Sequence, residues 1–216
     1  MRAGFCFSIL VFGACLLRAE IIDRIAISVG NQVITERQID QDVRLTAFLN
    51  EEKLDLDLAA RKKAAGRLIE QTLIRREIEL SRYPLPEMSE AQKSLEKIRA
   101  RYASEAAYQK ALEAYGIDES ALLERLWWQE TFLRFIEYRF RPGILIQDAD
   151  VQAYYQKQLE NWKKQGVERI PSLDEVRAKI EQTLTEQRID QDLERWLSET
   201  RKQVAIRYHD QELAAT

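Results

Sequence analysis

The most regular apolar pattern in the chain runs from residue 118 to residue 141, a stretch without glycine or proline. Apolar residues recur there every three, four or seven positions, which predicts a helix of about six to seven turns. They form two stripes roughly a third of a turn apart: Leu122, Leu126, Leu133, Ile136 and Phe140 in one, and Trp128, Phe132 and Phe135 in the other. Two stripes indicate that helices pack on this helix from more than one side, or that part of its aromatic surface is open to a partner.

A different pattern, with apolar residues at every second position, predicts strands near both ends of the chain. Residues 25–29 show this alternation, Gly30-Asn31 stands where a two-residue hairpin turn would fall, and Val33-Ile34 continues after the turn. A lone hairpin is only marginally stable in water, so it needs a third strand. The alternating run 204–208 could supply that strand and close one unit from both ends of the chain.

The remaining spacing predicts further helices with recognisable ends. Thr35 and Ser172 each begin a capping box, and the helix from Ser172 is expected to reach about residue 203. Gly116 is expected to end a helix in the left-handed conformation. Other helices are expected over 58–82, 89–102, 104–115 and 118–141, and from 147 or 148 until the chain becomes a polar segment at 161–171. The fold class is therefore mostly α, a multi-helix core with a small antiparallel sheet formed by an N-terminal hairpin and a C-terminal strand.

Composition agrees with a globular chain that also carries a targeting segment. The protein has 216 residues, of which 45 % are hydrophobic and 32 % charged. Arg2, the uncharged apolar run 5–17 and the small residue Ala19 are typical of a secretory signal peptide over 1–19. The apolar run is too short to span a bilayer, which needs about 20 residues. We expect a secreted mature chain that begins at Glu20; attachment of a lipid at Cys15 is the less favoured alternative.

Cleavage at that point changes the cysteine count and the charge. Both cysteines, Cys6 and Cys15, lie in the signal segment, so the mature chain has no thiol and forms no disulfide. It keeps 31 of the 33 Lys and Arg and all 36 Asp and Glu, a formal charge of −5. Without a basic excess, nucleic acid is not an expected partner. The basic runs at 61–63 and 75–76 are interpreted as solvated helix faces.

The residue inventory argues against an enzyme. The single histidine, His209, lies in a polar tail with no obvious partner to orient it. A Cys/His metal site is excluded by composition in the mature chain, and neither a nucleotide-binding glycine motif nor a hydrolase GxSxG motif is present. We therefore expect no catalytic residue, no metal and no cofactor, and a binding protein is the favoured class.

Two segments together resemble the SurA-type periplasmic chaperones and their parvulin-linked relatives. The first, within 21–158, contains IAISVGNQVITERQID at 25–40, LIEQTLIRREIELSR at 68–82 and YRFRPGILIQDADVQAYYQ at 138–156. The second is SLDEVRAKIEQTLTEQRIDQDLERWLSETRKQVAIRY at 172–208, which is similar to the long helix and closing strand at the C-terminus of these chaperones. The resemblance covers most of the mature chain and rests on patterns, not on invariant catalytic residues.

The resemblance implies a domain organisation. In the family, the two segments form one chaperone core, and one or two parvulin-type prolyl isomerase domains are inserted between them. Here residues 159–171 occupy the insertion point and are too few for a domain of on the order of a hundred residues. It follows that 20–158 forms an N-terminal chaperone domain, 159–171 a linker at the position of the missing isomerase, and 172–209 the C-terminal helix and strand that complete the core, followed by a tail at 210–216.

The resemblance implies an ATP-independent holdase of the periplasm that binds unfolded outer-membrane or secreted proteins, without prolyl isomerase activity. Unfolded β-barrel precursors expose alternating apolar residues, and aromatic side chains offer them a large contact area. The candidate client-binding residues are Trp127, Trp128, Phe132 and Phe135. The alternative is a structural or assembly protein of the cell envelope with one dedicated partner, which could be a second copy in a homodimer. No stable membrane span is expected.

Overall fold

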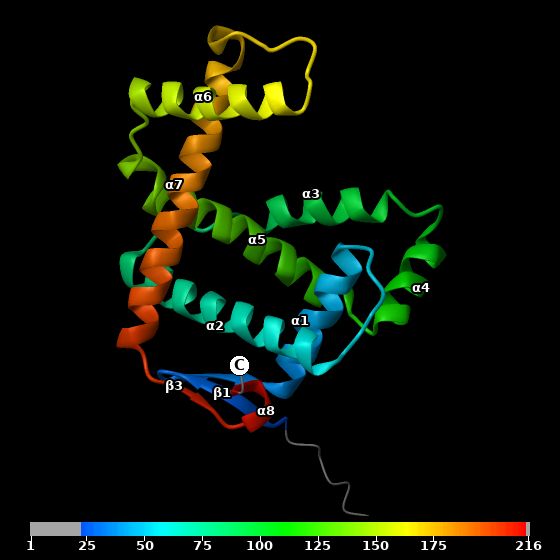
Figure 1. Ribbon diagram of the computed structural model, residues 1–216. Coiled ribbons are helices and arrows are strands. Elements are labelled where there is room, and N and C mark those ends of the chain that lie inside the picture. Colours follow the sequence, from blue (N-terminus) through cyan, green and yellow to red (C-terminus); the bar gives the residue numbers. More distant parts are fainter. Residues whose placement is uncertain (1–22, 215–216) are drawn as a thin grey trace, which may run out of the picture.

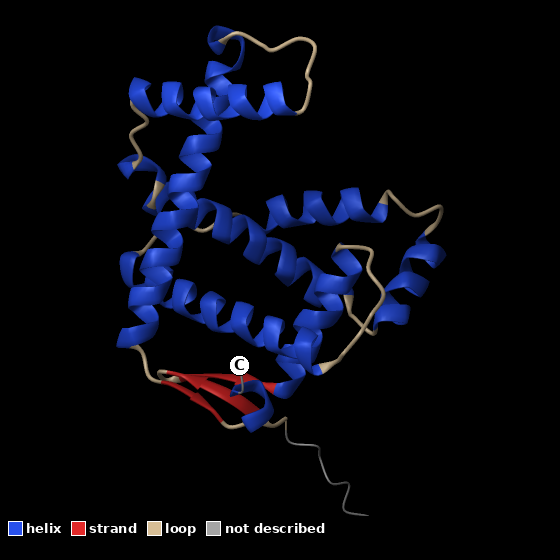
Figure 2. Ribbon diagram, in the orientation of Figure 1, coloured by secondary structure: helices blue, strands red, loops and turns tan. Residues whose placement is uncertain are grey.

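The computed structural model describes residues 23–214. The predicted signal peptide and the alternative lipid site at Cys15 lie outside these residues. A small sheet occupies one end of a helical body (Figure 2). The elements in chain order are β1 (Ile25–Val29), β2 (Gln32–Thr35), α1 (Glu36–Leu49), α2 (Leu58–Ser81), α3 (Met88–Arg99), α4 (Glu105–Tyr115), α5 (Glu119–Arg139), a 3-10 turn η1 (Arg141–Gly143), α6 (Asp148–Lys164), α7 (Leu173–Gln203), β3 (Ile206–Tyr208) and α8 (Gln211–Ala214).

The sheet joins the two ends of the described chain, as predicted. Its order is β2-β1-β3, and both pairings are antiparallel. Gly30 has a positive φ of 60°, which glycine adopts without steric cost, and together with Asn31 it forms the turn between β1 and β2. The third strand that the hairpin needed is β3, as the pattern at 204–208 indicated. Because β1 is central, β2 and β3 are both edge strands.

The helix ends confirm the predicted caps. The hydroxyl of Thr35 accepts the Gln38 N–H at 3.2 Å while the Gln38 side chain accepts the Thr35 N–H at 2.9 Å, and Ser172 begins a second capping box. Gly116 ends α4 with a φ of 63°. The predicted helices therefore form with boundaries that differ by a few residues.

Two segments differ from the predictions. Residues 159–164, expected to begin the linker, are the last turns of α6, so the loop between α6 and α7 starts at residue 165. The predicted polar tail contains the short helix α8, and the side chain of Leu213 is only 6 % exposed against the core. Burial of this one apolar residue holds α8 against the core at the sheet end of the molecule.

The core consists of three groups of buried side chains, and α5 contributes to two of them. Leu122 and Leu126 pack with α1, α3 and α4, whereas Trp128 and Phe135 pack with the C-terminal part of α2 and with α7. This confirms that helices pack on α5 from more than one side. Leu133, predicted in the first stripe, is 57 % exposed, so that stripe is not buried along its whole length.

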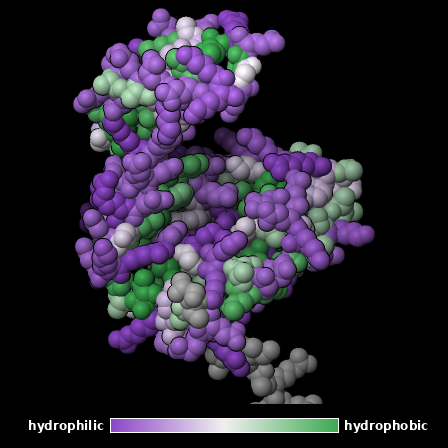
Figure 3. Space-filling view, viewed as in Figure 1, coloured by the Kyte–Doolittle hydropathy of each residue, from purple (hydrophilic) through white to green (hydrophobic). Residues whose placement is uncertain are grey.

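Helix α7 connects the sheet to a separate helical lobe. It runs from β3 past the ends of α2 and α5 to α6, which crosses it at the far end (Figure 1). Two ion pairs fix α6 on α7: Arg177 to Asp148 at 2.6 Å and Arg188 to Asp150 at 2.7 Å. The Arg177 guanidinium lowers the pKa of Asp148 below its usual value. Figure 3 shows this lobe set off from the body by a constriction, with hydrophilic side chains over most of the visible face.

Candidate functional site

A groove of about 750 Å³ opens between the β1–β2 hairpin and helices α1, α2 and α5. We call it the hairpin groove. It is lined by the hairpin segment 29–34, by α1 residues between Gln38 and Leu45, by α2 residues between Leu68 and Leu80, by α5 residues between Ala121 and Trp128, and by Val204. Its volume lies within the range of about 300–1,000 Å³ that is typical of ligand-binding clefts.

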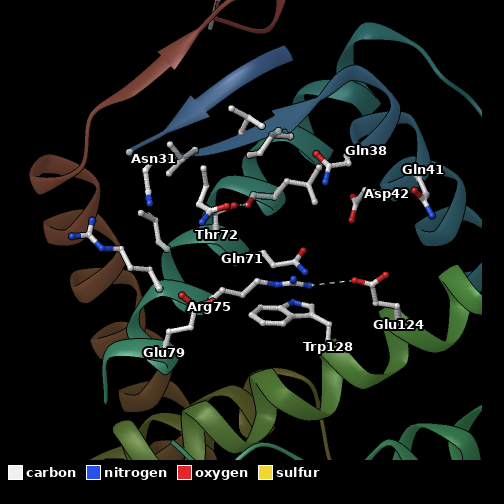
Figure 4. Close-up of a pocket in the computed structure, with 18 of the residues that line it drawn as sticks. Asn31, Gln38, Gln41, Asp42, Gln71, Thr72, Arg75, Glu79, Glu124 and Trp128 are labelled. Carbon is white, nitrogen blue, oxygen red and sulfur yellow. Dashed lines mark hydrogen bonds and ion pairs between the residues drawn. The ribbon is translucent and has the colours of Figure 1, made fainter. Parts of the chain in front are cut away.

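Several side-chain amides line this groove. Asn31 lies at the hairpin turn, Gln38 and Gln41 lie on α1, and Gln71 lies on α2 (Figure 4). The amides of Asn31, Gln41 and Gln71 make no hydrogen bond to any residue of the described range 23–214. The amide NH₂ of Gln38 is also free within that range, since only its oxygen is used in the capping box. Each amide has a donor and an acceptor, the same pair of groups that a peptide unit carries.

An aromatic ring covered by a guanidinium forms the wall of the groove on the α5 side. The guanidinium carbon of Arg75 lies 4.9 Å from the ring centre of Trp128, within the range of a cation–π contact. Arg75 is also 3.8 Å from the Glu124 carboxylate (Figure 4). Arg75 thus covers the ring of Trp128 while its own side chain stays 42 % exposed, and Arg76 is exposed, as predicted for a solvated helix face.

A buried carboxylate fixes the relative positions of the three helices. Asp42 on α1 is 3 % exposed and accepts hydrogen bonds from Arg67 on α2 at 2.9 and 2.5 Å and from Arg125 on α5 at 2.5 Å. The hydroxyl of Thr46 accepts from both arginines at 3.3 and 3.5 Å. Charge-assisted bonds of this kind have strict geometry, so the network holds the walls of the groove at a set separation.

The four aromatic residues predicted as client-binding do not form one surface. Only Trp128 lines the hairpin groove. Trp127 packs on the α3 side and donates its indole N–H to the carbonyl of Pro86 at 3.0 Å. Phe135 is 1 % exposed, with its ring 5.5 Å from that of Trp196, and the partly buried Phe132 packs beside this cluster. Phe135 is therefore a core residue in this conformation.

The sequence reasoning did not single out the amides or Asp42. Gln38 and Gln41 are three positions apart on α1, the spacing that places two side chains on one helix face, but glutamine is common on any solvated face. Asp42 follows Ile39 by three positions and so lies on the apolar face of α1. A charged residue on a buried face is the one signal that could have indicated a buried ion pair, because such residues are rarely buried without a partner.

The other candidate chemistry is sparse. His209 has a partner that the sequence did not reveal: its Nε2 lies 2.8 Å from the Ser28 hydroxyl on the exposed side of the sheet. Within residues 23–214 no carboxylate bonds to the other ring nitrogen, and no group of three or more His, Cys, Asp or Glu could hold a metal ion. None of the helices in that range is long and apolar enough to cross a membrane.

Comparison with known proteins adds no family to these observations. No protein-family model matches the chain, and no curated protein matches it significantly.

Proposed function

We propose that the protein is an ATP-independent chaperone of the periplasm that holds unfolded outer-membrane or secreted proteins in the hairpin groove. The observation that carries the proposal is that the free amides of Asn31, Gln41 and Gln71 line a groove of about 750 Å³. Such amides pair with the peptide backbone, which every unfolded protein presents, and therefore bind without demanding one sequence.

The charge of the groove supports a broad range of clients. Three arginines line it, Arg75, Arg76 and Arg125, together with three carboxylates, Asp42, Glu79 and Glu124. Balanced charge neither attracts nor repels a segment of either sign strongly. The resemblance to the SurA-type chaperones agrees with this function, and a loop of eight residues or fewer after α6 leaves no room for an isomerase domain at that point.

The test is suppression of aggregation. A denatured outer-membrane β-barrel protein is diluted from urea, and light scattering is followed with and without the protein at several-fold molar excess. We expect suppression by the wild type. The double variant Gln41→Ala/Gln71→Ala loses two hydrogen bonds to the client, each of about 0.5–1.5 kcal/mol, and should bind roughly 5- to 140-fold more weakly.

A matched control removes two amides elsewhere. Gln156 on α6 and Gln187 on α7 are exposed and lie outside the groove, so Gln156→Ala/Gln187→Ala should suppress aggregation as the wild type does. Equal loss in both double variants would refute the groove as the client site. No suppression by the wild type would refute the holdase function. In a prolyl isomerase assay, the protein should leave the isomerisation rate of a proline-containing peptide at the background value, since the proposed function includes no isomerase activity.

A dedicated envelope partner is the second candidate. Leu133 and Tyr138 on α5 are 57 % and 53 % exposed, large apolar side chains of the kind that one fixed partner would cover. If the wild type fails to suppress aggregation, the pair Leu133→Ser/Tyr138→Ser becomes the informative variant in a pull-down of envelope proteins.

A further inference from the structure

The backbone groups of β1 alternate between the two neighbouring strands. The Gly30 N–H donates to the Ala205 carbonyl at 2.8 Å, and the Ala26 carbonyl accepts the His209 N–H at 2.8 Å. Residues 26, 28 and 30 therefore direct their peptide groups toward β3. Because this direction alternates along a strand, Ile27 and Val29 direct theirs toward β2.

The same alternation fixes the free edge of β2. Gln32 lies opposite Val29 and Ile34 opposite Ile27, so Gln32 and Ile34 use their peptide groups in the hairpin. Val33, opposite Ser28, directs its N–H and C=O away from β1. No residue within 23–214 bonds to these two groups. The side chain of Val33 is 47 % exposed, and Val33 lines the hairpin groove.

We propose that an extended segment of client polypeptide adds to β2 as a fourth strand and lies in the hairpin groove. This inference rests on the proposed function and specifies how the client is recognised. Val33 supplies one donor and one acceptor to the added strand. The free amides of Asn31, Gln41 and Gln71 supply further pairs along its length, where β2 itself has ended.

The shortness of β2 determines the strength of this contact. The strand has four residues, and α1 follows it without a break, so the edge offers a single outward pair of backbone groups. A long free edge would be a template for irreversible pairing and aggregation. One pair with a few side-chain amides gives weak, reversible binding instead, which suits a holdase that releases its client without ATP.

The variant Val33→Pro removes the outward donor and leaves the hairpin bonds intact. Proline is tolerated on an edge strand where the N–H faces away from the sheet, and the fixed φ of proline is compatible with an extended strand. Val33→Thr is the matched control, since it changes the side chain and keeps the N–H. Urea unfolding of both variants shows whether the fold is retained.

The probe is a fluorescein-labelled peptide of about ten residues that alternates valine and threonine, a typical strand length. A second peptide has the same side chains with every backbone nitrogen methylated, so that it cannot donate. Anisotropy titration should show at least tenfold weaker binding of the methylated peptide to the wild type, because that peptide has lost every backbone donor. Binding of the plain peptide to Val33→Pro should be roughly fivefold weaker, as expected from the loss of one hydrogen bond of about 1 kcal/mol. Val33→Thr should bind the plain peptide within about twofold of the wild type.

Several results would overturn the inference. Equal binding of the two peptides would show that the groove recognises the side chains of the client and that the client backbone does not pair with the edge of β2. The holdase function would not be affected by that result. If the wild type suppresses aggregation yet does not bind the plain peptide, the added strand is likewise refuted and the holdase function is retained. Self-association of the wild type that Val33→Pro abolishes would place a second copy on β2 and exclude the client.

If Val33→Pro does not fold, strand addition at β2 is tested on the wild-type protein. Hydrogen exchange of the Val33 amide, resolved by NMR, should slow at least tenfold when the plain peptide saturates the protein, because the added strand accepts from that amide. An unchanged rate at saturation would overturn the inference.

Discussion

Asp42 is the residue whose removal should damage the fold and the groove together. In Asp42→Ala the guanidinium groups of Arg67 and Arg125 lose the carboxylate that both contact, and Arg125 is only 17 % exposed. Removing one partner of a buried ion pair costs about 3–5 kcal/mol, because the remaining charge is left without compensation. Arg67 is 37 % exposed and can regain water, so we expect the lower end of this range, about 3 kcal/mol.

Urea unfolding measures this loss. With a slope of about 1–3 kcal/mol per molar urea, the midpoint should fall by roughly 1–3 M. Asp40→Ala is the matched control: Asp40 lies on the same helix, pairs with Arg61 at 3.1 Å and is 40 % exposed, so its loss should cost at most about 1 kcal/mol. Both changes replace aspartate by alanine within α1, and the gain in helix propensity therefore cancels between them.

A difference of less than about 0.5 kcal/mol between the two variants would refute the reasoning, since it would show that Asp42 contributes no more than a surface ion pair. The groove gives a second measurement. Because Asp42 joins α1 to both α2 and α5, the variant should also suppress aggregation less well at a temperature where it is still folded, whereas Asp40→Ala should not differ from the wild type.

Three further predictions concern the packing of the described chain. Phe135→Ala should cost about 3–5 kcal/mol in urea unfolding because the side chain is 1 % exposed, while Leu133→Ala at 57 % exposure should stay within about 0.5 kcal/mol of the wild type. Leu213→Ala should cost about 2 kcal/mol, the low end for a buried leucine, because the short α8 can settle into the space; a loss below about 0.5 kcal/mol would mean that α8 is not docked. The Arg177 guanidinium lowers the pKa of Asp148 in the folded protein. The stabilisation of α6 by this pair is therefore complete at a pH above the unfolded aspartate pKa of about 3.9, and it is lost as the pH falls through the lower pKa of the folded state. Amide hydrogen exchange in α6 should therefore accelerate in acid beyond its intrinsic pH dependence, and Arg177→Gln should remove that extra acceleration.

Much of the fold follows from local sequence. The turn at Gly30-Asn31, the capping boxes at Thr35 and Ser172 and the left-handed Gly116 are decided by a few neighbouring residues, because hydroxyl caps and positive φ values act within one turn of the chain. The alternation at 204–208 even located the third strand, since a hairpin alone would be too weak. The conformation of these elements is therefore determined by interactions between residues that are close in the sequence.

The groove was decided only by the tertiary structure. The amides of Gln41 and Gln71 come from different helices, and nothing near either one in the sequence shows that they face a common opening beside the edge of β2. The aromatic stripes of α5 predicted contact on two sides but not which residue each neighbouring helix would cover, so Leu133 became exposed and Phe135 buried. Spacing along a helix fixes the direction of a side chain relative to its own axis, whereas burial and access depend on where the other helices end.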